Sequence, residues 1–476
     1  MRHKATMKRR LKVSDNRRFL VFEDGTPFFW LGDTVWELFH RSMIEEAELY
    51  LENRRQKGFT IIQAVVLAEF DGLNVPNVYG ERPLFNDDPL RPNEKYFRTI
   101  DQVIDLARQK GIFVGLVPTW GDKIELLGHG IGPIIFNPDN AYAYGQWLGR
   151  RYRDVENLVW INGGDRPGGG TNIPVWDALG RGIKSVDPNH LMTFHPPGAG
   201  DGRSSSEWFH HVDWLDFNLA QSGHVRRHLP NYEIVGHDYR LTPTKPCLDG
   251  EPRYEDHGIN WKPAELGWFD DCDAREAAYW ALFAGAFGHT YGCHPVWQMC
   301  SPRYEPITFA RRPWQEAMDL PGAFQMTHVK NLMLSRPLLS RIPDQALVAA
   351  GANGDAPAVM ATRDEDGRYA FVYLPLGGRV AVDLERLSGA SLNTWWYDPR
   401  LGTAALGGSV RRRGVREFAA PSEGRGNDWV LVLDDSSAGF PPPGGPLSEV
   451  GPPAGAWFCD LSPCQWPCRQ VESSSQ

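Results

Sequence analysis

Two acidic residues, Asp165 and Glu251, each follow a short apolar run that is typical of a buried strand. Asp165 is reached from residues 158–162 through two glycines, and Glu251 is reached from residues 246–249 through one. If the two runs are strands of one parallel barrel, both carboxylates project into the same mouth. A facing pair of carboxylates is the minimum set of groups for breaking a glycosidic bond. The alternative is that each acid caps a helix or pairs with an arginine, as loop acids commonly do.

The elements that would position these acids alternate along the first two thirds of the chain. Eight strand-like runs are separated by stretches of helical period, which predicts an α/β fold with a (β/α)8 TIM barrel, since eight strands close such a barrel. Helices are predicted over 42–58, where Ser42 and Glu45 would form a capping box, over 96–110 and over 273–287. The predicted strands are 28–31, 60–66, 112–118, 158–162, 191–194, 214–218, 246–249 and 289–291.

The pattern changes after about Asp344, where short strand-like runs alternate with Gly- and Asp-rich turns. These runs predict a small antiparallel β-sandwich, and they are 346–350, 358–362, 369–374, 380–384, 392–397 and 429–433. The predicted domains are therefore a basic N-terminal segment (1–16), a catalytic barrel (17–343), a C-terminal β-sandwich (344–435) and a disordered Pro/Gly/Ser-rich tail (436–476).

The composition favours an uncharged partner such as an oligosaccharide or polysaccharide. A net charge of −9, from 50 basic and 59 acidic residues, argues against nucleic-acid binding. The 18 tryptophans suit stacking on sugar faces, although most of them must pack in the core. The basic start has no apolar core of a signal peptide behind it, and no run reaches the length of a membrane helix, so we expect a cytoplasmic protein without a membrane partner. The seven cysteines follow no zinc-binding spacing and are expected to be reduced thiols.

Further polar and aromatic residues follow the predicted strands, at the end where a barrel builds its active site. A sugar is bound by polar groups that reach its hydroxyls and by flat apolar faces that cover its C–H surfaces. Any one of these residues alone would more often be structural, so the prediction rests on their joint occurrence at strand ends. The candidate substrate-binding residues are Asp33, Trp36, Trp120, Asp122, Asn162, His195, Asn218, Gln221 and Trp297.

Metal-dependent hydrolysis is a competing chemistry, for which Asp33, His195, His289 and His294 could supply ligands. However, no His-x-His follows the first strand, and no lysine stands where it would form a bridging carbamate. A nucleophilic serine is disfavoured as well, because the chain has no Gly-x-Ser-x-Gly turn. We therefore predict an enzyme without a metal or another cofactor.

Three motifs resemble the apiosidase-like glycoside hydrolases, family 140: WLGDTVW at 30–36, WINGGD at 160–165 and DGEP at 249–252. The resemblance covers about residues 14–435 and includes a trailing β domain of the collagen-binding type. It implies a (β/α)8 barrel with an acid/base after the fourth strand and a nucleophile after the seventh. By position, Asp165 would be the acid/base and Glu251 the nucleophile. It also implies the removal of apiose, a branched pentose, from pectin side chains.

The prediction is thus a retaining exo-glycoside hydrolase acting on pectin-type glycans, with carboxyl groups about 5–5.5 Å apart rather than the roughly 6.5–9.5 Å of an inverting enzyme. Glu69 and Glu255 are the next candidates for the nucleophile. Another pentose-directed glycosidase, such as an arabinofuranosidase, is one alternative. A non-catalytic carbohydrate or matrix binder is the other, with Trp395, Trp396 and Tyr397 of the β domain either as a binding platform or as packed core.

Overall fold

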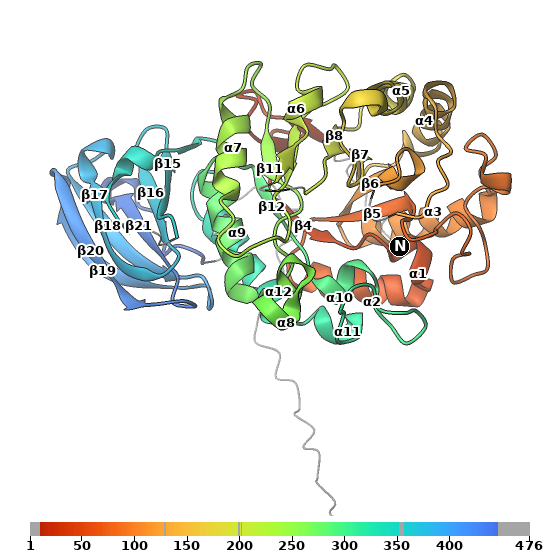
Figure 1. Ribbon diagram of the computed structural model, residues 1–476. Coiled ribbons are helices and arrows are strands. Elements are labelled where there is room, and N and C mark those ends of the chain that lie inside the picture. Colours follow the sequence, from red (N-terminus) through yellow and green to blue (C-terminus); the bar gives the residue numbers. More distant parts are fainter. Residues whose placement is uncertain (1–9, 128–129, 199, 201, 352–356, 446–476) are drawn as a thin grey trace, which may run out of the picture.

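The computed structural model describes residues 10–127, 130–198, 200, 202–351 and 357–445 as a barrel followed by a β domain (Figure 1). Most of the tail predicted to be disordered, including its three cysteines, lies outside the described residues, and so do residues 1–9. None of the helices in the described ranges is long and apolar enough to cross a bilayer.

Eight parallel strands form the predicted barrel, in the spatial order β12-β4-β5-β6-β7-β8 followed by β10-β11. Backbone hydrogen bonds complete the ring between the two groups, from Asp216 N to Met192 O (2.8 Å) and from Phe287 N to Cys247 O (3.0 Å). The strands are β4 (Trp30–Thr34), β5 (Ile61–Leu67), β6 (Phe113–Thr119), β7 (Leu158–Gly163), β8 (Met192–His195), β10 (Asn218–Gln221), β11 (Cys247–Asp249) and β12 (Gly288–Tyr291).

All eight predicted strands overlap these elements, but the sixth does so only at Asn218 and is otherwise displaced. Residues 214–218 were predicted as a strand, whereas β10 begins at Asn218. Trp214, Leu215 and Phe217 are buried ahead of the strand, so their apolar character marks burial in the core rather than strand pairing.

Helices surround the barrel: α1 (Leu38–Arg41), α2 (Ile44–Gln56), α3 (Glu94–Gln109), α4 (Pro138–Tyr152), α5 (Ile173–Lys184), α6 (Ser206–Phe209), α7 (Asn231–Arg240), α8 (Pro263–Leu266), α9 (Asp271–Phe283), α10 (His294–Trp297), α11 (Trp314–Ala317) and α12 (Pro321–Leu334). The start of α2 lies one residue later than predicted, because the carboxylate of Glu46 accepts from Met43 N (2.9 Å). The end of α9 comes four residues earlier than predicted, where Gly285 takes a φ of +118°. Seven short 3₁₀ turns are η1 (Phe85–Asp87), η2 (Gly121–Lys123), η3 (Gly170–Asn172), η4 (Ile259–Trp261), η5 (Gln345–Leu347), η6 (Leu384–Arg386) and η7 (Ser436–Ala438).

A small antiparallel sheet precedes the barrel and comprises β1 (Leu11–Val13), β2 (Leu20–Phe22) and β3 (Pro27–Phe28). Phe22 and Phe28 of this sheet contact Phe113, with ring centroids 6.2 and 5.2 Å away. Because Phe113 begins β6, the sheet covers the amino end of the barrel. The N-terminal segment that was predicted only as basic therefore contributes a strand, and no structural boundary falls at residue 16.

The β domain consists of two antiparallel sheets, in the orders β13-β15-β16-β21-β18-β19 and β14-β17-β20. Apolar residues buried between the sheets, such as Val372, Val382 and Leu431, form its core, which fits the predicted sandwich. Two long strands, β19 and β20, were not predicted, because most of their residues are exposed and lack an apolar alternation. The strands are β13 (Arg341–Pro343), β14 (Val348–Ala350), β15 (Met360–Asp364), β16 (Tyr369–Leu374), β17 (Gly377–Asp383), β18 (Ser391–Asp398), β19 (Thr403–Arg411), β20 (Val415–Glu423) and β21 (Trp429–Asp435); a further short strand, β9 (Arg203–Ser204), pairs with β10.

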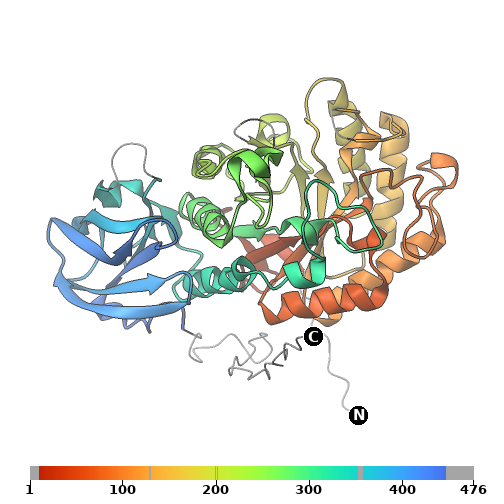
Figure 2. The ribbon, with the colours of Figure 1, turned by 60° about the horizontal axis from the view of Figure 1, so that its bottom comes forward.

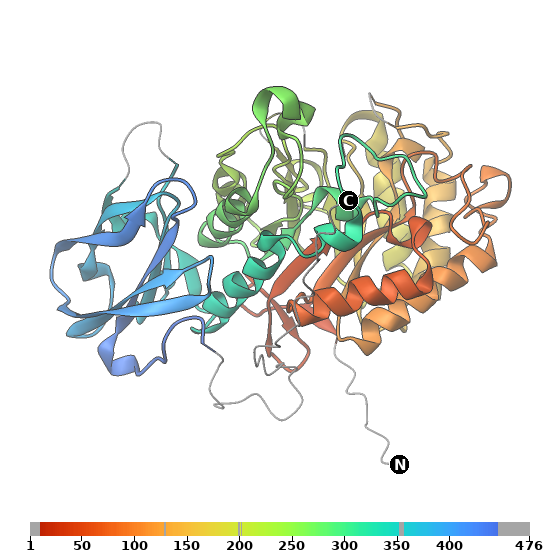
Figure 3. The ribbon, with the colours of Figure 1, turned by 90° about the horizontal axis from the view of Figure 1, so that it is seen from below.

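The two domains pack together along α9 and α12, which Figures 2 and 3 show beside the blue β domain. Arg275 of α9 forms a double hydrogen bond with Asp428, at 2.7 and 2.9 Å, and both side chains are buried. The ring of Tyr279 stacks on that of Tyr373, with centroids 4.7 Å apart. The contact is therefore a continuous core with buried charges that are paired.

The aromatic run of β18 belongs largely to this packing. Tyr397 is buried and donates its hydroxyl to His328 O (2.8 Å) in α12, and Trp395 packs against the larger core. Trp396 is partly buried against the core of the sandwich. Of the two alternatives for this run, the packed core agrees with the structure.

We predict that Arg275→Ala lowers the free energy of unfolding by about 3–5 kcal/mol, because it leaves the buried Asp428 without its charged partner. Arg379→Ala is the matched control, since its pair with Glu417 lies on the surface and its loss is expected to cost at most about 1 kcal/mol. Denaturant unfolding of both variants measures the difference. Equal effects of the two substitutions would show that the interface pair does not stabilise the protein.

Candidate active site

Asp165 is brought to the mouth of the barrel by a turn of three residues with positive φ. Gly163, Gly164 and Asp165 have φ values of +94°, +132° and +52°. A Cβ at Gly163 would lie 2.3 Å from His195 O, and one at Gly164 would lie 2.9 Å from the Trp120 ring. The turn is held by hydrogen bonds from Gly164 N to His195 O and from Gly121 N to Gly164 O, both 3.0 Å. Two glycines are therefore required to direct Asp165 into the opening.

Glu251 is held as firmly from the opposite side of the barrel. A Cβ at Gly250 would lie 2.6 Å from the Leu219 side chain, so only glycine allows β10 and the end of β11 to approach this closely. Gly250 N donates to Ala220 O (2.8 Å), and Gln63 donates its side-chain amide to Gly250 O (3.0 Å). These contacts fix the backbone that carries Glu251.

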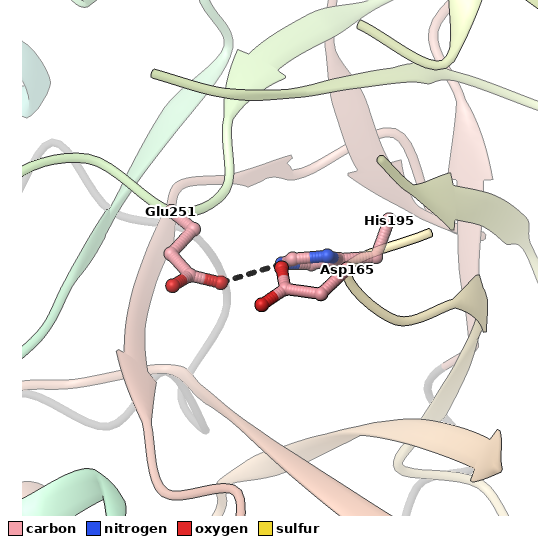
Figure 4. A group of neighbouring side chains, drawn as sticks. All are labelled: Asp165, His195 and Glu251. Carbon is pink, nitrogen blue, oxygen red and sulfur yellow. Dashed lines mark ion pairs between the residues drawn. The ribbon is translucent and has the colours of Figure 1, made fainter. Parts of the chain in front are cut away.

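The two acids meet across the opening, together with His195 (Figure 4). One carboxylate oxygen of Asp165, one ring nitrogen of His195 and one carboxylate oxygen of Glu251 all lie within 4.8 Å of one another. Glu251 enters from one side in Figure 4, and Asp165 and His195 enter from the other. Asp165 is half-buried, whereas His195 and Glu251 are buried. The sequence placed all three at strand ends, and the structure brings them together.

Two histidines neutralise the buried carboxylate of Glu251. His195 Nε2 lies 2.8 Å from Oε2, in ion-pair contact rather than in a linear hydrogen bond, and His224 Nε2 lies 3.2 Å from Oε1. Burial alone would raise the pKa of Glu251, but its interactions with His195 and His224 outweigh burial and lower the pKa to about 2. Burial opposes the charge on His195 as well, and the two acids nevertheless raise its pKa above 6.5. Glu251 is therefore favoured as a carboxylate, and the two acids favour the protonated form of His195.

Tyr254 adds a neutral donor beside Glu251. Burial, followed by the charge of Glu251, raises the pKa of Tyr254 well above 10, so its phenol keeps the proton. His224 and Tyr254 each follow a predicted site residue by three positions and were not predicted. The signal from which they could have been predicted was their position in the loops at the carboxyl ends of β10 and β11. His224 follows Gln221 by three residues, and Tyr254 follows Glu251 by three.

Aromatic rings enclose the three charged groups. Trp36 lies 5.2 Å from both Trp120 and His195, measured between ring centroids, and Trp120 lies 5.9 Å from His195. Both indoles are only 2% exposed. This wall excludes water from one side of the acids, which strengthens the electrostatic interactions among them.

Two predicted substrate-binding acids are instead structural, and these predictions are corrected. Asp33 is buried and accepts from Arg54 Nε (2.5 Å) and from the Tyr50 hydroxyl (2.6 Å), both in α2. Asp122 is buried and lies 2.7 Å from Lys123 Nζ. Successive side chains of a strand point to opposite faces, so the strand-end position alone could not tell that Asp33 faces the helices rather than the barrel mouth.

The two predicted asparagines are corrected for the same reason. Asn162 donates its amide to Trp176 O (2.9 Å) in α5, and Asn218 pairs with His210 at 3.1 Å; all four residues are buried. Their amides satisfy buried polar groups of the helix layer and of a loop, and neither is available to a sugar.

Gln221 and Trp297 remain beside the mouth. The Gln221 side chain packs against Gly198, in the loop after β8. Trp297 donates its indole N–H to His294 Nδ1 (3.1 Å), and its ring lies 6.1 Å from that of Phe70. Both side chains keep a small exposed fraction.

Neither alternative nucleophile is placed as Glu251 is. Glu255 accepts from the Tyr291 hydroxyl (2.5 Å) and from Gly322 N (3.0 Å), and burial raises its pKa to about 7. Burial, together with the charges of Glu37 and Asp165, raises the pKa of Glu69 well above 4.5. Their raised pKa values favour the protonated carboxyl, so each is less available for attack than Glu251, whose pKa is lowered.

Asp33, His195, His289 and His294, the residues considered as metal ligands, do not come together in one site among the described residues. Asp33 pairs with Arg54, and the buried His289 has its pKa lowered to about 3 by burial and by the charge of Arg253. Within the described ranges, the group with suitable geometry is the one formed by Asp165, His195 and Glu251. A metal there would compete with protonation of His195, which the two acids favour, because only neutral imidazole is a ligand.

Comparison with known proteins identifies the family of this chain. Residues 14–340 match the family model described as "Apiosidase-like, catalytic domain". The chain belongs to the apiosidase-like glycoside hydrolases. Residues 342–434 match the model "Putative collagen-binding domain of a collagenase". These matches confirm the family, the trailing domain and the enzyme class predicted from the motifs, and they exclude a purely non-catalytic binder.

Two solved structures are similar to this apiosidase-like chain over most of its length. One, titled "Glycoside hydrolase", is 37% identical with a TM-score of 0.82, and the match covers 90% of this chain and 97% of the other. A glycoside hydrolase family 5 protein from Bacteroides vulgatus ATCC 8482 is 35% identical with a TM-score of 0.82, and the match covers 90% and 94%. Both support the barrel and sandwich architecture. A search of curated proteins finds no match.

We predict that Gly164→Ala lowers kcat/KM on the order of 10²-fold, because an added Cβ at 2.9 Å from the Trp120 ring displaces the turn that carries Asp165. Gly170→Ala is the matched control, since Gly170 also has positive φ (+62°) but has nothing within 4 Å of the added Cβ. Steady-state kinetics with circular dichroism to verify folding compares the two. A comparable loss in both variants would show that backbone conformation matters and contact with Trp120 does not.

Proposed function

We propose that this enzyme is a retaining exo-glycosidase that releases a pentose such as apiose from pectin-type glycans. Asp165 serves as acid/base and Glu251 as nucleophile. The observation that supports the proposal is that carboxylate oxygens of the two acids lie within 4.8 Å of each other. Retaining glycosidases hold their two carboxyl groups about 5–5.5 Å apart, whereas inverting enzymes need room for a water between them.

In the first step, a carboxylate oxygen of Glu251 attacks the anomeric carbon while Asp165 donates its proton to the leaving glycosidic oxygen. The bond between the anomeric carbon and that oxygen breaks, and a glycosyl ester with Glu251 forms. In the second step, Asp165 takes a proton from water, and the water oxygen displaces Glu251 from the anomeric carbon. Two inversions leave the product with the configuration of the substrate.

The surroundings suit Glu251 to attack rather than to proton donation. The low pKa of Glu251 keeps it ionised at neutral pH, and His195 and His224 contact its two oxygens. Asp165 is the more exposed of the two acids, so it can exchange protons with water and with a leaving oxygen. The two acids therefore occupy the different environments that their different tasks require.

The enclosed geometry supports exo action on a terminal sugar. Trp36 and Trp120 lie on one side of the site, and Glu251 is only 4% exposed, so little of the attacking carboxylate is open to a long chain. The choice of apiose follows the apiosidase-like description of the family, and the choice of pectin follows the resemblance of the sequence motifs. An arabinofuranosidase-like specificity would use the same two acids and differ only in the hydrogen bonds to the sugar hydroxyls.

We predict that the enzyme releases apiose from pectin oligosaccharides. Glu251→Gln is expected to lower kcat at least about 10³-fold, because the amide cannot form the glycosyl ester. Glu255→Gln is the matched control, a buried glutamate in the same loop whose replacement is expected to keep most of the activity. Chromatography identifies the sugar that is released. Equal losses in the two variants, or activity retained in Glu251→Gln, would reassign the nucleophile.

The configuration of the first product tests the proposed stereochemistry. In the presence of methanol, NMR should show a methyl glycoside with the anomeric configuration of the substrate, since methanol replaces water in the second step. An inverted product would contradict the retaining mechanism. Release of arabinose in place of apiose would keep the mechanism and change the substrate.

We predict that His224→Phe moves the acid limb of the kcat/KM profile to higher pH by about one unit, because a hydrogen bond to a charged group is lost. The sign follows from the lowered pKa of Glu251: removal of a donor raises that pKa, so protonation and loss of activity begin at a higher pH. His228→Phe is the control, since His228 pairs with Glu276 (2.7 Å) instead. An unchanged acid limb in His224→Phe would mean that His224 does not tune the nucleophile.

A further inference from the structure

One tryptophan near the acids remains open to solvent. Trp261, in η4, is 44% exposed, whereas Trp36 and Trp120 are almost completely buried. An exposed indole is costly to solvate and well shaped for stacking on a flat partner. It lies in the segment between β11 and α9, which also contains Glu251.

Trp261 is separated from Glu251 by a single imidazole. His224 contacts the Glu251 carboxylate at 3.2 Å, and the Trp261 ring lies 6.0 Å from the His224 ring at an angle of 76°. His257 supports the same indole, with ring centroids 5.3 Å apart at 85°. The indole is therefore packed edge-to-face against the two histidines next to Glu251.

The loop that presents this indole is rigid. Asn260 and Trp261 both take left-handed φ values, +50° and +56°, which residues other than glycine adopt only when the surroundings enforce them. Asn260 N donates to His224 O (2.8 Å), and Ile259 N donates to Gly267 O (3.0 Å). Arg312 Nε pairs with Asp256 (3.0 Å) at the start of the loop. The chain thus holds an exposed aromatic ring in a strained conformation at a defined place.

We infer that Trp261 is the stacking surface for the leaving-group sugar, the ring next to the one that Glu251 attacks. This inference rests on the proposed function, because it takes Glu251 as the attacking group and one enclosed sugar as the glycone. A glycone between Asp165 and Glu251 is covered by the buried Trp36 and Trp120, so the next ring of the substrate has to lie outside that enclosure. The exposed indole beside His224 offers it an apolar face.

Binding to an inactive variant tests the inference without turnover. In the Glu251→Gln background, Trp261→Ala is expected to weaken binding of an apiose-terminated pectin oligosaccharide about tenfold in calorimetry, since one aromatic contact is lost. Binding of free apiose should stay unchanged, because it occupies only the enclosed position. Trp261→Phe should recover most of the affinity for the oligosaccharide.

Phe324→Ala in the same background is the matched control, because Phe324 is equally exposed (48%) on α12 and should leave both affinities unchanged. Unchanged oligosaccharide binding in Trp261→Ala would overturn the inference, and so would an equal weakening for free apiose, which would place the indole at the glycone. Failure of the proposed function would show separately, as absence of sugar release by the wild-type enzyme.

Discussion

The buried carboxylate of Glu251 is the constraint on which the site depends. A charged group out of water must be paired, and here two imidazoles meet its two oxygens. His195 comes from β8 and His224 from the loop after β10, so three separate parts of the barrel must be in place before the acid can be ionised. The glycine turns before Asp165 and Glu251 serve the same end, because they let the backbone approach closely enough for these contacts.

The requirement that a buried charge be paired also explains Asp33 and Asp122, which lie outside the proposed catalytic pair. Asp33 and Asp122 stand at strand ends just as Asp165 and Glu251 do, yet each is neutralised by a cation beside it, Arg54 and Lys123. What distinguishes the proposed pair, Asp165 and Glu251, is that one histidine, His195, lies beside both acids. A histidine can yield its position and proton more readily than an arginine, which keeps its charge at any physiological pH.

Much of the architecture could be predicted because barrel strands are nearly continuous apolar runs. The exceptions are places where apolar character and strand pairing do not coincide. Trp214, Leu215 and Phe217 are apolar and buried but lie outside a strand, whereas β19 and β20 pair as strands with little burial, so the apolar pattern failed in both places. In the site, Asp165, Glu251 and His195 could be located from their places after strands. The side chains of Asp33 and Asn162 could not be placed, because their direction depends on which face of the strand they occupy. His224 and Tyr254 were missed because their positions depend on the paths of loops that join distant segments.

Helix α9 has a wider consequence. Every residue of it from Asp273 to Phe283 is buried, because the barrel covers one side and the β domain covers the other. A helix without a solvent face cannot belong to either neighbour alone. Separating the barrel from the β domain would expose the apolar side chains along α9 and promote aggregation. The two domains are therefore expected to fold as one unit.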